Sequence, residues 1–131
     1  SAASDVYKRQ TIGCDLVALS EIEESVAAFG DRFLHRVFTA SELVACGGAL
    51  RTPRLAARFA AKEATIKALG LVDVATPPRD IEVLTGRGGP PELRLHGAIA
   101  RLGAHRGWRD ATVSLSHSHC HAIAVVAAEV D

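Results

Sequence analysis

The chain has 131 residues, and its 15 basic and 15 acidic residues cancel to a formal net charge of zero. Its 48% of hydrophobic and 23% of charged residues are typical of one globular domain that buries an apolar core. The balanced charge gives no support for bulk attraction to nucleic acid or to an anionic membrane, so we expect neither partner.

Hydrophobic patterning and capping signals predict a mixture of strands and helices. Residues 1–10 are polar and aperiodic and are interpreted as a leader, which leaves 11–131 as the domain. In chain order we expect a strand over 11–19, helices over 20–29, from 31, over 40–46 and over 53–69, strands over 80–84 and 93–95, a helix over 97–105, and strands over 111–117 and 123–128. Because strands and helices do not alternate strictly, the predicted fold class is α+β.

Several residues mark where these elements begin or touch. Ser20 and Thr52 are expected to cap two of the helices, and Thr39 with Glu42 forms a capping box before a third. Gly13 allows another backbone to approach the first strand closely. The continuous apolar run near the end of the chain predicts a central strand.

Three cysteines, Cys14, Cys46 and Cys120, are scattered without a paired spacing. This pattern indicates free thiols in a reducing compartment, so we expect a cytoplasmic protein.

The long helix carries the first cluster of chemistry-bearing residues. Glu63 and Lys67 are four residues apart, as are Arg58 and Lys62, so each pair shares a helix face. A carboxylate beside several cations suits a phosphate-ester site, because Mg²⁺ prefers carboxylate oxygens and cations neutralise phosphoryl charge. The alternative is an ordinary solvated helix face with a Glu–Lys pair.

Asp15 is an acidic residue within the otherwise apolar first strand. An unpaired carboxylate is costly to bury, so Asp15 is either a metal ligand or a structural residue with satisfied hydrogen bonds. Together with Glu63, it could hold one Mg²⁺ between two elements.

The segment from Ser114 to His121 places three histidines in alternation with small polar residues. If the segment stayed extended, His117, His119 and His121 would share one face, and a zinc site is conceivable. Ser116 and His117 at a strand end could instead hydrogen-bond a phosphate. A surface turn is the third interpretation.

Three motifs occur in a recognisable order along the chain: Gly13–Val17, Arg58–Gly70 and Val113–His117. In this order they resemble the holo-acyl-carrier-protein synthase family, the short 4'-phosphopantetheinyl transferases. The resemblance covers residues 11 to about 130. It implies a single α+β domain in which a small antiparallel sheet packs against one long helix and several short ones.

The resemblance also implies a reaction. Members of this family transfer the phosphopantetheine arm of coenzyme A to a serine of an apo acyl carrier protein, of the fatty acid or polyketide type, and release adenosine 3',5'-bisphosphate. Asp15 and Glu63 would hold Mg²⁺ against the coenzyme A diphosphate, and Lys67 would stabilise the leaving phosphate. Either Glu63 or a water on the metal would act as base. Members of the family form homotrimers with the site between subunits.

Further contacts to coenzyme A are implied for four residues. Lys62 and Arg58 would contact its phosphates or organise the site, and Ser116 and His117 would hold its nucleotide end, with the 3'-phosphate. Two other hypotheses stay open: a metal-binding regulatory module built on the histidines and Cys120, and a coenzyme A binder without catalytic activity.

The sequence departs from the family pattern where the carrier protein docks. Many members have Glu at the position of Ala18 and a basic residue at the position of Glu21. That basic residue helps to bind the acidic carrier helix. Docking here must therefore depend on other cations, with Arg32, Arg36 and Arg51 as candidates.

Overall fold

The computed structural model describes residues 9–71, 75–86 and 88–131. The elements in chain order are β1 (Arg9–Ala18), α1 (Leu19–Phe29), α2 (Asp31–Val37), α3 (Ala40–Ala45), α4 (Arg51–Ala68), the 3₁₀ turn η1 (Pro78–Asp80), β2 (Ile81–Leu84), β3 (Glu92–Leu95), α5 (Gly97–His105), β4 (Trp108–His117) and β5 (His121–Val130). The α+β class and the expected order of elements are confirmed.

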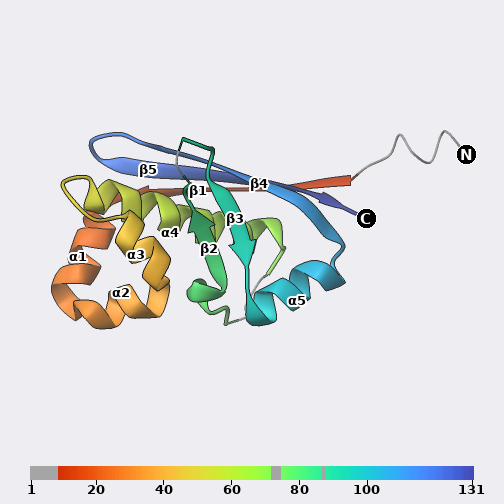
Figure 1. Cartoon of the computed structure of the whole chain (residues 1–131), viewed down its shortest axis with the longest axis horizontal. Coiled ribbons are helices and arrows are strands. Elements are labelled where there is room, and N and C mark those ends of the chain that lie inside the picture. Colours follow the sequence, from red (N-terminus) through yellow and green to blue (C-terminus); the bar gives the residue numbers. More distant parts are fainter. Residues whose placement is uncertain (1–8, 72–74, 87) are drawn as a thin grey trace, which may run out of the picture.

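Two antiparallel sheets make up the β structure. Strands β1, β5 and β4 form a three-stranded sheet with β5 in the centre, as the apolar run at the chain end predicts. Strands β2 and β3 form a separate two-stranded hairpin. Helix α4 lies beneath the larger sheet, with α1 to α3 at one end of the molecule and the hairpin and α5 at the other (Figure 1).

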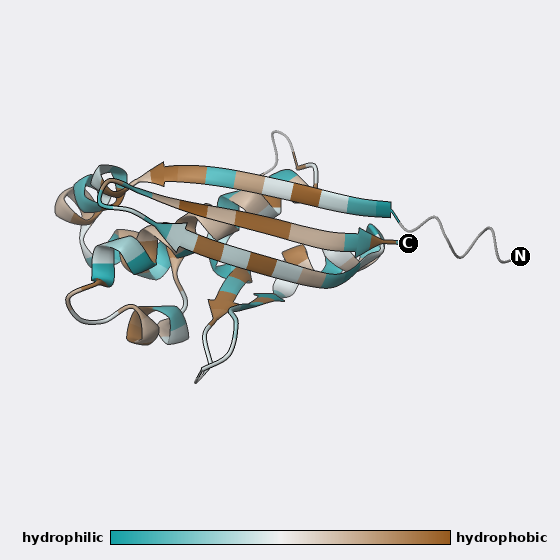
Figure 2. Cartoon of the chain, turned by 90° about the horizontal axis from the view of Figure 1, so that it is seen from above, coloured by the Kyte–Doolittle hydropathy of each residue, from teal (hydrophilic) through white to brown (hydrophobic). Residues whose placement is uncertain are grey.

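Helix α4 is the centre of the core and is buried over most of its circumference. Its buried positions include five alanines at 0–4% exposure and Leu55 at 1%, and small side chains let the sheet, α1 and β2 come close. Burial therefore covers more than the one apolar stripe of an ordinary amphipathic helix, because neighbours contact this helix from several sides. The opposite face of the three-stranded sheet is left uncovered by the described helices (Figure 2).

Some predicted boundaries and caps are wrong. Strand β1 begins at Arg9, which pairs with Val130, two residues before the predicted start of this strand. The N-caps of α1 and α4 are Ala18 and Leu50, without side-chain hydrogen bonds, in place of Ser20 and Thr52.

A tertiary contact determines where α1 begins. The Leu19 amide donates to the Cys120 carbonyl at 2.9 Å, so the β4–β5 turn satisfies this helix end. By contrast, the Thr39–Glu42 capping box of α3 is confirmed. All three cysteines are free thiols, as expected. Over the described residues, we find no helix with both the length and the apolar character that crossing a membrane requires.

Candidate active site

Strand β1 lies directly on the second half of α4. The Thr11 hydroxyl donates to the Ala68 carbonyl at 2.6 Å, and a Cβ atom on Gly13 would lie only 1.9 Å from the Ala64 carbonyl oxygen. The close backbone approach predicted at Gly13 is thus confirmed. Because side chains alternate along a strand, the next inward residue after Thr11 and Gly13 is Asp15, which also faces α4.

The structure brings Asp15, Glu63 and Lys67 together at this contact. The Lys67 ammonium donates to Asp15 Oδ1 at 2.9 Å and to the Cys14 carbonyl at 3.1 Å. Glu63 lies one turn before Lys67 on α4, close enough for the charge of Asp15 to act on it. The Lys67 side chain is 57% exposed and that of Asp15 is 18% exposed, so the cluster opens to solvent.

The protonation of the cluster follows from these contacts. Partial burial, together with the negative charge of Asp15, raises the pKa of the Glu63 carboxyl above its usual value, while Lys67 opposes the shift. The hydrogen bond to Asp15 and its charge raise the pKa of Lys67, so this side chain stays an ammonium at neutral pH. Two partly exposed carboxylates that repel one another are a donor set that fits a hard divalent cation such as Mg²⁺.

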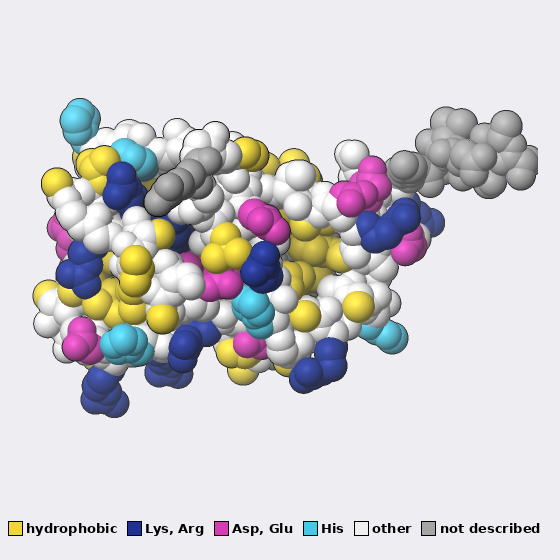
Figure 3. Space-filling model, in the orientation of Figure 1, with side chains coloured by type: hydrophobic (Ala, Val, Ile, Leu, Met, Phe, Trp, Pro, Cys, Tyr) yellow, Lys and Arg dark blue, Asp and Glu magenta, His cyan; other side chains and the backbone are white. Residues whose placement is uncertain are grey.

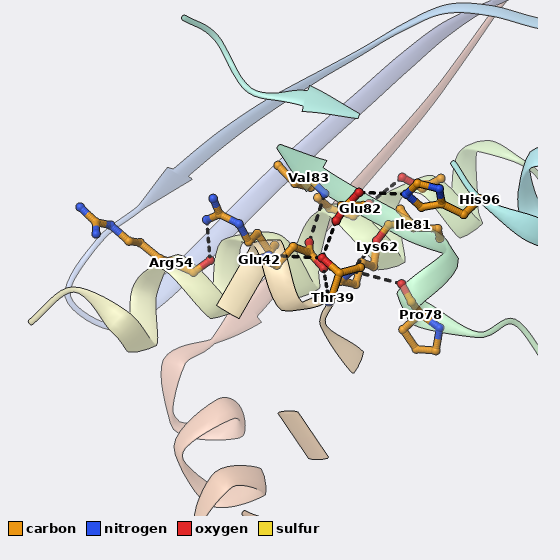
Figure 4. Close-up of polar contacts among 12 residues, drawn as sticks. Thr39, Glu42, Arg54, Lys62, Pro78, Ile81, Glu82, Val83 and His96 are labelled. Carbon is orange, nitrogen blue, oxygen red and sulfur yellow. Dashed lines mark hydrogen bonds and ion pairs between the residues drawn. The ribbon is translucent and has the colours of Figure 1, made fainter. Parts of the chain in front are cut away.

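Lys62 lies in the core, away from this cluster, and of the two roles expected for it, contact with a coenzyme A phosphate or organisation of the site, its position suits the second. The side chain is 1% exposed, and its ammonium donates to Glu42 Oε1 at 2.7 Å, to the Pro78 carbonyl at 3.1 Å and to the Ile81 carbonyl (Figure 4). Three acceptors use all three ammonium protons, so none is free for a phosphate. Burial lowers the pKa of Lys62, and the charge of Glu42 opposes the shift.

Arg58 is also buried, at 4% exposure. Its Nη2 donates to the Thr85 hydroxyl at 3.2 Å and its Nη1 to the Arg54 carbonyl at 3.4 Å. Arg58 and Lys62, which the sequence places on one face of α4, are therefore both covered by neighbouring elements. Of the two roles expected for Arg58, this position suits organisation of the site and not phosphate contact.

Ser116 and His117 end strand β4, on opposite sheet faces because they are adjacent in a strand. Both are exposed and line a shallow hollow of about 180 Å³ with Leu16, His121 and Ile123. In the register of the sheet, Ser116 pairs with Ile123 on β5, and Ile123 pairs with Leu16 on β1, so the hollow crosses all three strands and reaches the residue next to Asp15.

The three histidines of this segment do not share one face. The chain turns at residues 118–120, where Ser118 Oγ accepts from the Cys120 and His121 amides. His117 therefore belongs to one strand and His121 to the next. Within the described ranges, no group of three His, Cys, Asp or Glu side chains is arranged to hold a metal ion.

Two buried glutamates make polar contacts on the side of α4 that faces α3 and β2, and the sequence predicts no such contacts for them. Glu42 was predicted only as a capping-box residue, yet it is fully buried and pairs with Lys62. Glu82 accepts from the Thr39 hydroxyl and contacts His96 Nε2 at 2.9 Å. A lysine among alanines on a central helix was the available signal, because a buried ammonium requires a carboxylate or carbonyl partner.

The fold and the cluster of Asp15, Glu63 and Lys67 define a class of protein. The chain belongs to the 4'-phosphopantetheinyl transferase superfamily, whose family model matches residues 11–124. The predicted family resemblance is thereby confirmed.

Two relatives and one solved structure are similar to most of the chain. The chain is 40% identical over 119 residues to the holo-[acyl-carrier-protein] synthase of Desulfovibrio desulfuricans, with 90% of this chain and 95% of the relative covered. It is 43% identical over 121 residues to the synthase of Herpetosiphon aurantiacus, with 87% and 94% covered. A solved structure described as a Chronobacterium ammoniagenes ACPS-CoA complex superposes with a TM-score of 0.83 at 31% identity, covering 94% of this chain and 98% of that one.

Proposed function

We infer that the chain is a holo-acyl-carrier-protein synthase that transfers 4'-phosphopantetheine from coenzyme A to a serine of an apo acyl carrier protein. The observation that carries this conclusion is the family match over residues 11–124, within which Asp15, Glu63 and Lys67 lie together. In the reaction, the serine oxygen forms a new phosphoester bond and loses its proton. The phosphoanhydride bond to adenosine 3',5'-bisphosphate breaks.

We propose that Asp15 and Glu63 hold Mg²⁺. When bound, this ion supplies charge neutralisation at the diphosphate of coenzyme A. Lys67 is exposed and holds a proton beside Asp15, so its ammonium can turn to the oxygen of the leaving phosphate and stabilise its charge. The carboxylate of Glu63 is also a candidate acceptor for the serine proton.

The raised pKa of Glu63 predicts a pH-dependent need for magnesium. A carboxylate must lose its proton to bind a metal, so protons and Mg²⁺ compete at Glu63 at a higher pH than at an ordinary glutamate. We expect the half-saturating Mg²⁺ concentration to rise as the pH falls towards the raised pKa of Glu63, by up to about tenfold per unit below that pKa. Initial rates over a Mg²⁺ series at each pH measure this, and a half-saturating concentration that does not change with pH would contradict it.

We propose that Ser116 and His117 contact the nucleotide end of coenzyme A. The hollow at the β4–β5 turn is exposed, and the Ser116 hydroxyl and the His117 imidazole are both suited to hydrogen-bond a phosphate. Arg58 would act from within the fold by fixing α4 against the loop at Thr85.

The acidic carrier protein requires a basic docking surface, and we place it on α2. Arg32 and Arg36 line a hollow of about 380 Å³ with Phe29 and Phe33. Basic side chains stand out along this edge of the molecule, at the lower left in Figure 3. This arrangement supports the suggestion that Arg32 and Arg36 replace the cation that the sequence lacks at Glu21.

Reversing these charges should weaken carrier binding. We expect the double substitution Arg32→Glu and Arg36→Glu to raise the KM for the carrier at low salt by about 10–100-fold, since charge reversal turns attraction into repulsion. The KM for coenzyme A should stay unchanged. Arg101→Glu, an exposed arginine on α5, is the matched control. An unchanged carrier KM in the double variant would place the docking surface elsewhere.

We further propose that the chain acts as a homotrimer in the cytoplasm, in the formation of carriers for fatty acid or polyketide synthesis. The uncovered face of the three-stranded sheet exposes Ile12 at 70%, Leu16 at 62% and Ile123 at 36%, a patch suited to contact with further copies of the chain. We expect light scattering to give the mass of three chains, and Leu16→Asp to reduce it to one. A wild-type chain that is monomeric at assay concentration would contradict the trimer.

A further inference from the structure

A buried polar cluster lies on the side of α4 that faces α3 and β2. Glu42 and Lys62 are its centre, with side chains 0% and 1% exposed and the pairing atoms 2.7 Å apart (Figure 4). Glu42 Oε1 also accepts from the Thr39 amide at 3.0 Å, and Oε2 accepts from the Val83 amide at 3.1 Å. The pair thus joins the first turn of α3, the middle of α4 and strand β2.

A buried ion pair is seldom the most stabilising way to fill a core, because both charges lose their hydration. Such a pair does restrict geometry. The Lys62 ammonium must satisfy Glu42, the Pro78 carbonyl and the Ile81 carbonyl together. Acceptors on α3 and on the continuous η1–β2 segment restrict the position of this nitrogen, and they therefore restrict the rotation of the helix that carries it.

That setting determines where the candidate catalytic side chains point. Successive residues of a helix are rotated by about 100°, so Lys62 fixes the direction of Glu63, the next residue, and of Lys67 one turn later. The contact of Gly13 with Ala64 sets how close β1 lies to α4. The hydrogen bonds of Lys62 set the rotation of α4 about its own axis beneath β1.

We infer that Glu42 and Lys62 are positioning residues, which hold α4 in the rotation that directs Glu63 towards Asp15. The inference rests on the proposed function, because it takes Glu63 and Asp15 as the metal-binding carboxylates. Neither Glu42 nor Lys62 contacts the substrate in this account. Outer residues that orient metal ligands in this way typically change metal affinity by about 10–100-fold when they are replaced.

The test compares Lys62→Met, Glu42→Gln and the double variant with wild-type protein. Leu34→Ala is the control, because it removes a buried side chain of α2 and lowers stability without touching the pair. Mn²⁺ binding is measured by electron paramagnetic resonance in the presence of coenzyme A, and the half-saturating Mg²⁺ concentration is measured in the transfer assay. Both are recorded well below each variant's Tm.

We expect each pair variant to weaken Mn²⁺ binding by about tenfold or more, and high Mg²⁺ to restore part of the lost transfer rate. The double variant should be no worse than the worse single variant, because the two residues act as one unit. Leu34→Ala should lower Tm and leave Mn²⁺ affinity unchanged.

Two outcomes would overturn this inference in different ways. If wild-type protein binds Mn²⁺ with coenzyme A while the pair variants lose only Tm, as Leu34→Ala does, then the pair has no positioning role. If wild-type protein binds neither Mn²⁺ nor coenzyme A and transfers nothing, the proposed function fails and the inference fails with it.

Discussion

Replacement of Glu63 by glutamine is expected to lower the rate of phosphopantetheine transfer by about 10³-fold, equivalent to about 4 kcal/mol of transition-state stabilisation. The substitution keeps the shape of the side chain and removes its negative charge. Charge is what a Mg²⁺ ligand contributes, and the variant leaves Asp15 without its proposed partner carboxylate at the metal. Transfer is followed by mass spectrometry of the carrier at fixed Mg²⁺.

The matched control for Glu63→Gln is Glu92→Gln, which removes an equal charge from an exposed position on β3. We expect this control to transfer at the wild-type rate. Circular dichroism and Tm of both variants should stay close to wild type, because Glu63→Gln leaves the packing intact. A Glu63→Gln protein that retains more than about a tenth of the wild-type rate would remove Glu63 from the proposed metal site.

Replacement of Gly13 by alanine is expected to destabilise the fold by about 3 kcal/mol or more, which lowers Tm by roughly 10 °C. The new methyl group would lie 1.9 Å from the Ala64 carbonyl oxygen and 2.9 Å from the Ala68 nitrogen. Both are backbone atoms of a central helix, so they cannot turn away as a side chain would. Strand β1 must move off α4, and Asp15 moves with it.

Transfer by Gly13→Ala should therefore fall even at temperatures where the variant is folded. Gly86→Ala is the control, since a Cβ at that glycine meets nothing within 4 Å. Thermal unfolding followed by circular dichroism compares the two at equal protein concentration. An unchanged Tm in Gly13→Ala would mean that β1 and α4 are not in contact at this point.

The elements that the sequence predicts best are those specified by local signals. The Thr39–Glu42 capping box, the helix over 97–105 and the apolar strand at the chain end follow from residues close together in sequence. The cluster of Asp15, Glu63 and Lys67 was also predictable. An acid in an apolar strand and a Glu–Lys pair one helical turn apart both indicate a site, and the family resemblance joins them.

Lys62 shows what local signals leave open. Helical periodicity places it with Arg58 on a polar stripe, and such a stripe is ordinarily solvated. Here α3 and β2 cover the stripe, and Lys62 pairs with Glu42, which lies twenty residues away in sequence. Periodicity gives the direction of a side chain but not the element that packs against it.

The caps of α1 show the same limit at a helix end. Ser20 has the side chain of a good N-cap, yet the helix begins before it because the Cys120 carbonyl accepts the Leu19 amide. A partner from the other end of the chain thus replaces the side-chain cap. Tertiary contacts of this kind override the intrinsic preference of a single residue.

The most direct test of the account is the mass of an apo acyl carrier protein after incubation with this chain, coenzyme A and Mg²⁺. The account predicts that the carrier gains the mass of one phosphopantetheine arm, that adenosine 3',5'-bisphosphate is released in equal amount, and that removal of Mg²⁺ with a chelator prevents both. No mass gain on any carrier of a fatty acid and polyketide panel, under conditions where the chain binds coenzyme A, would contradict the account and indicate a coenzyme A binder without transferase activity.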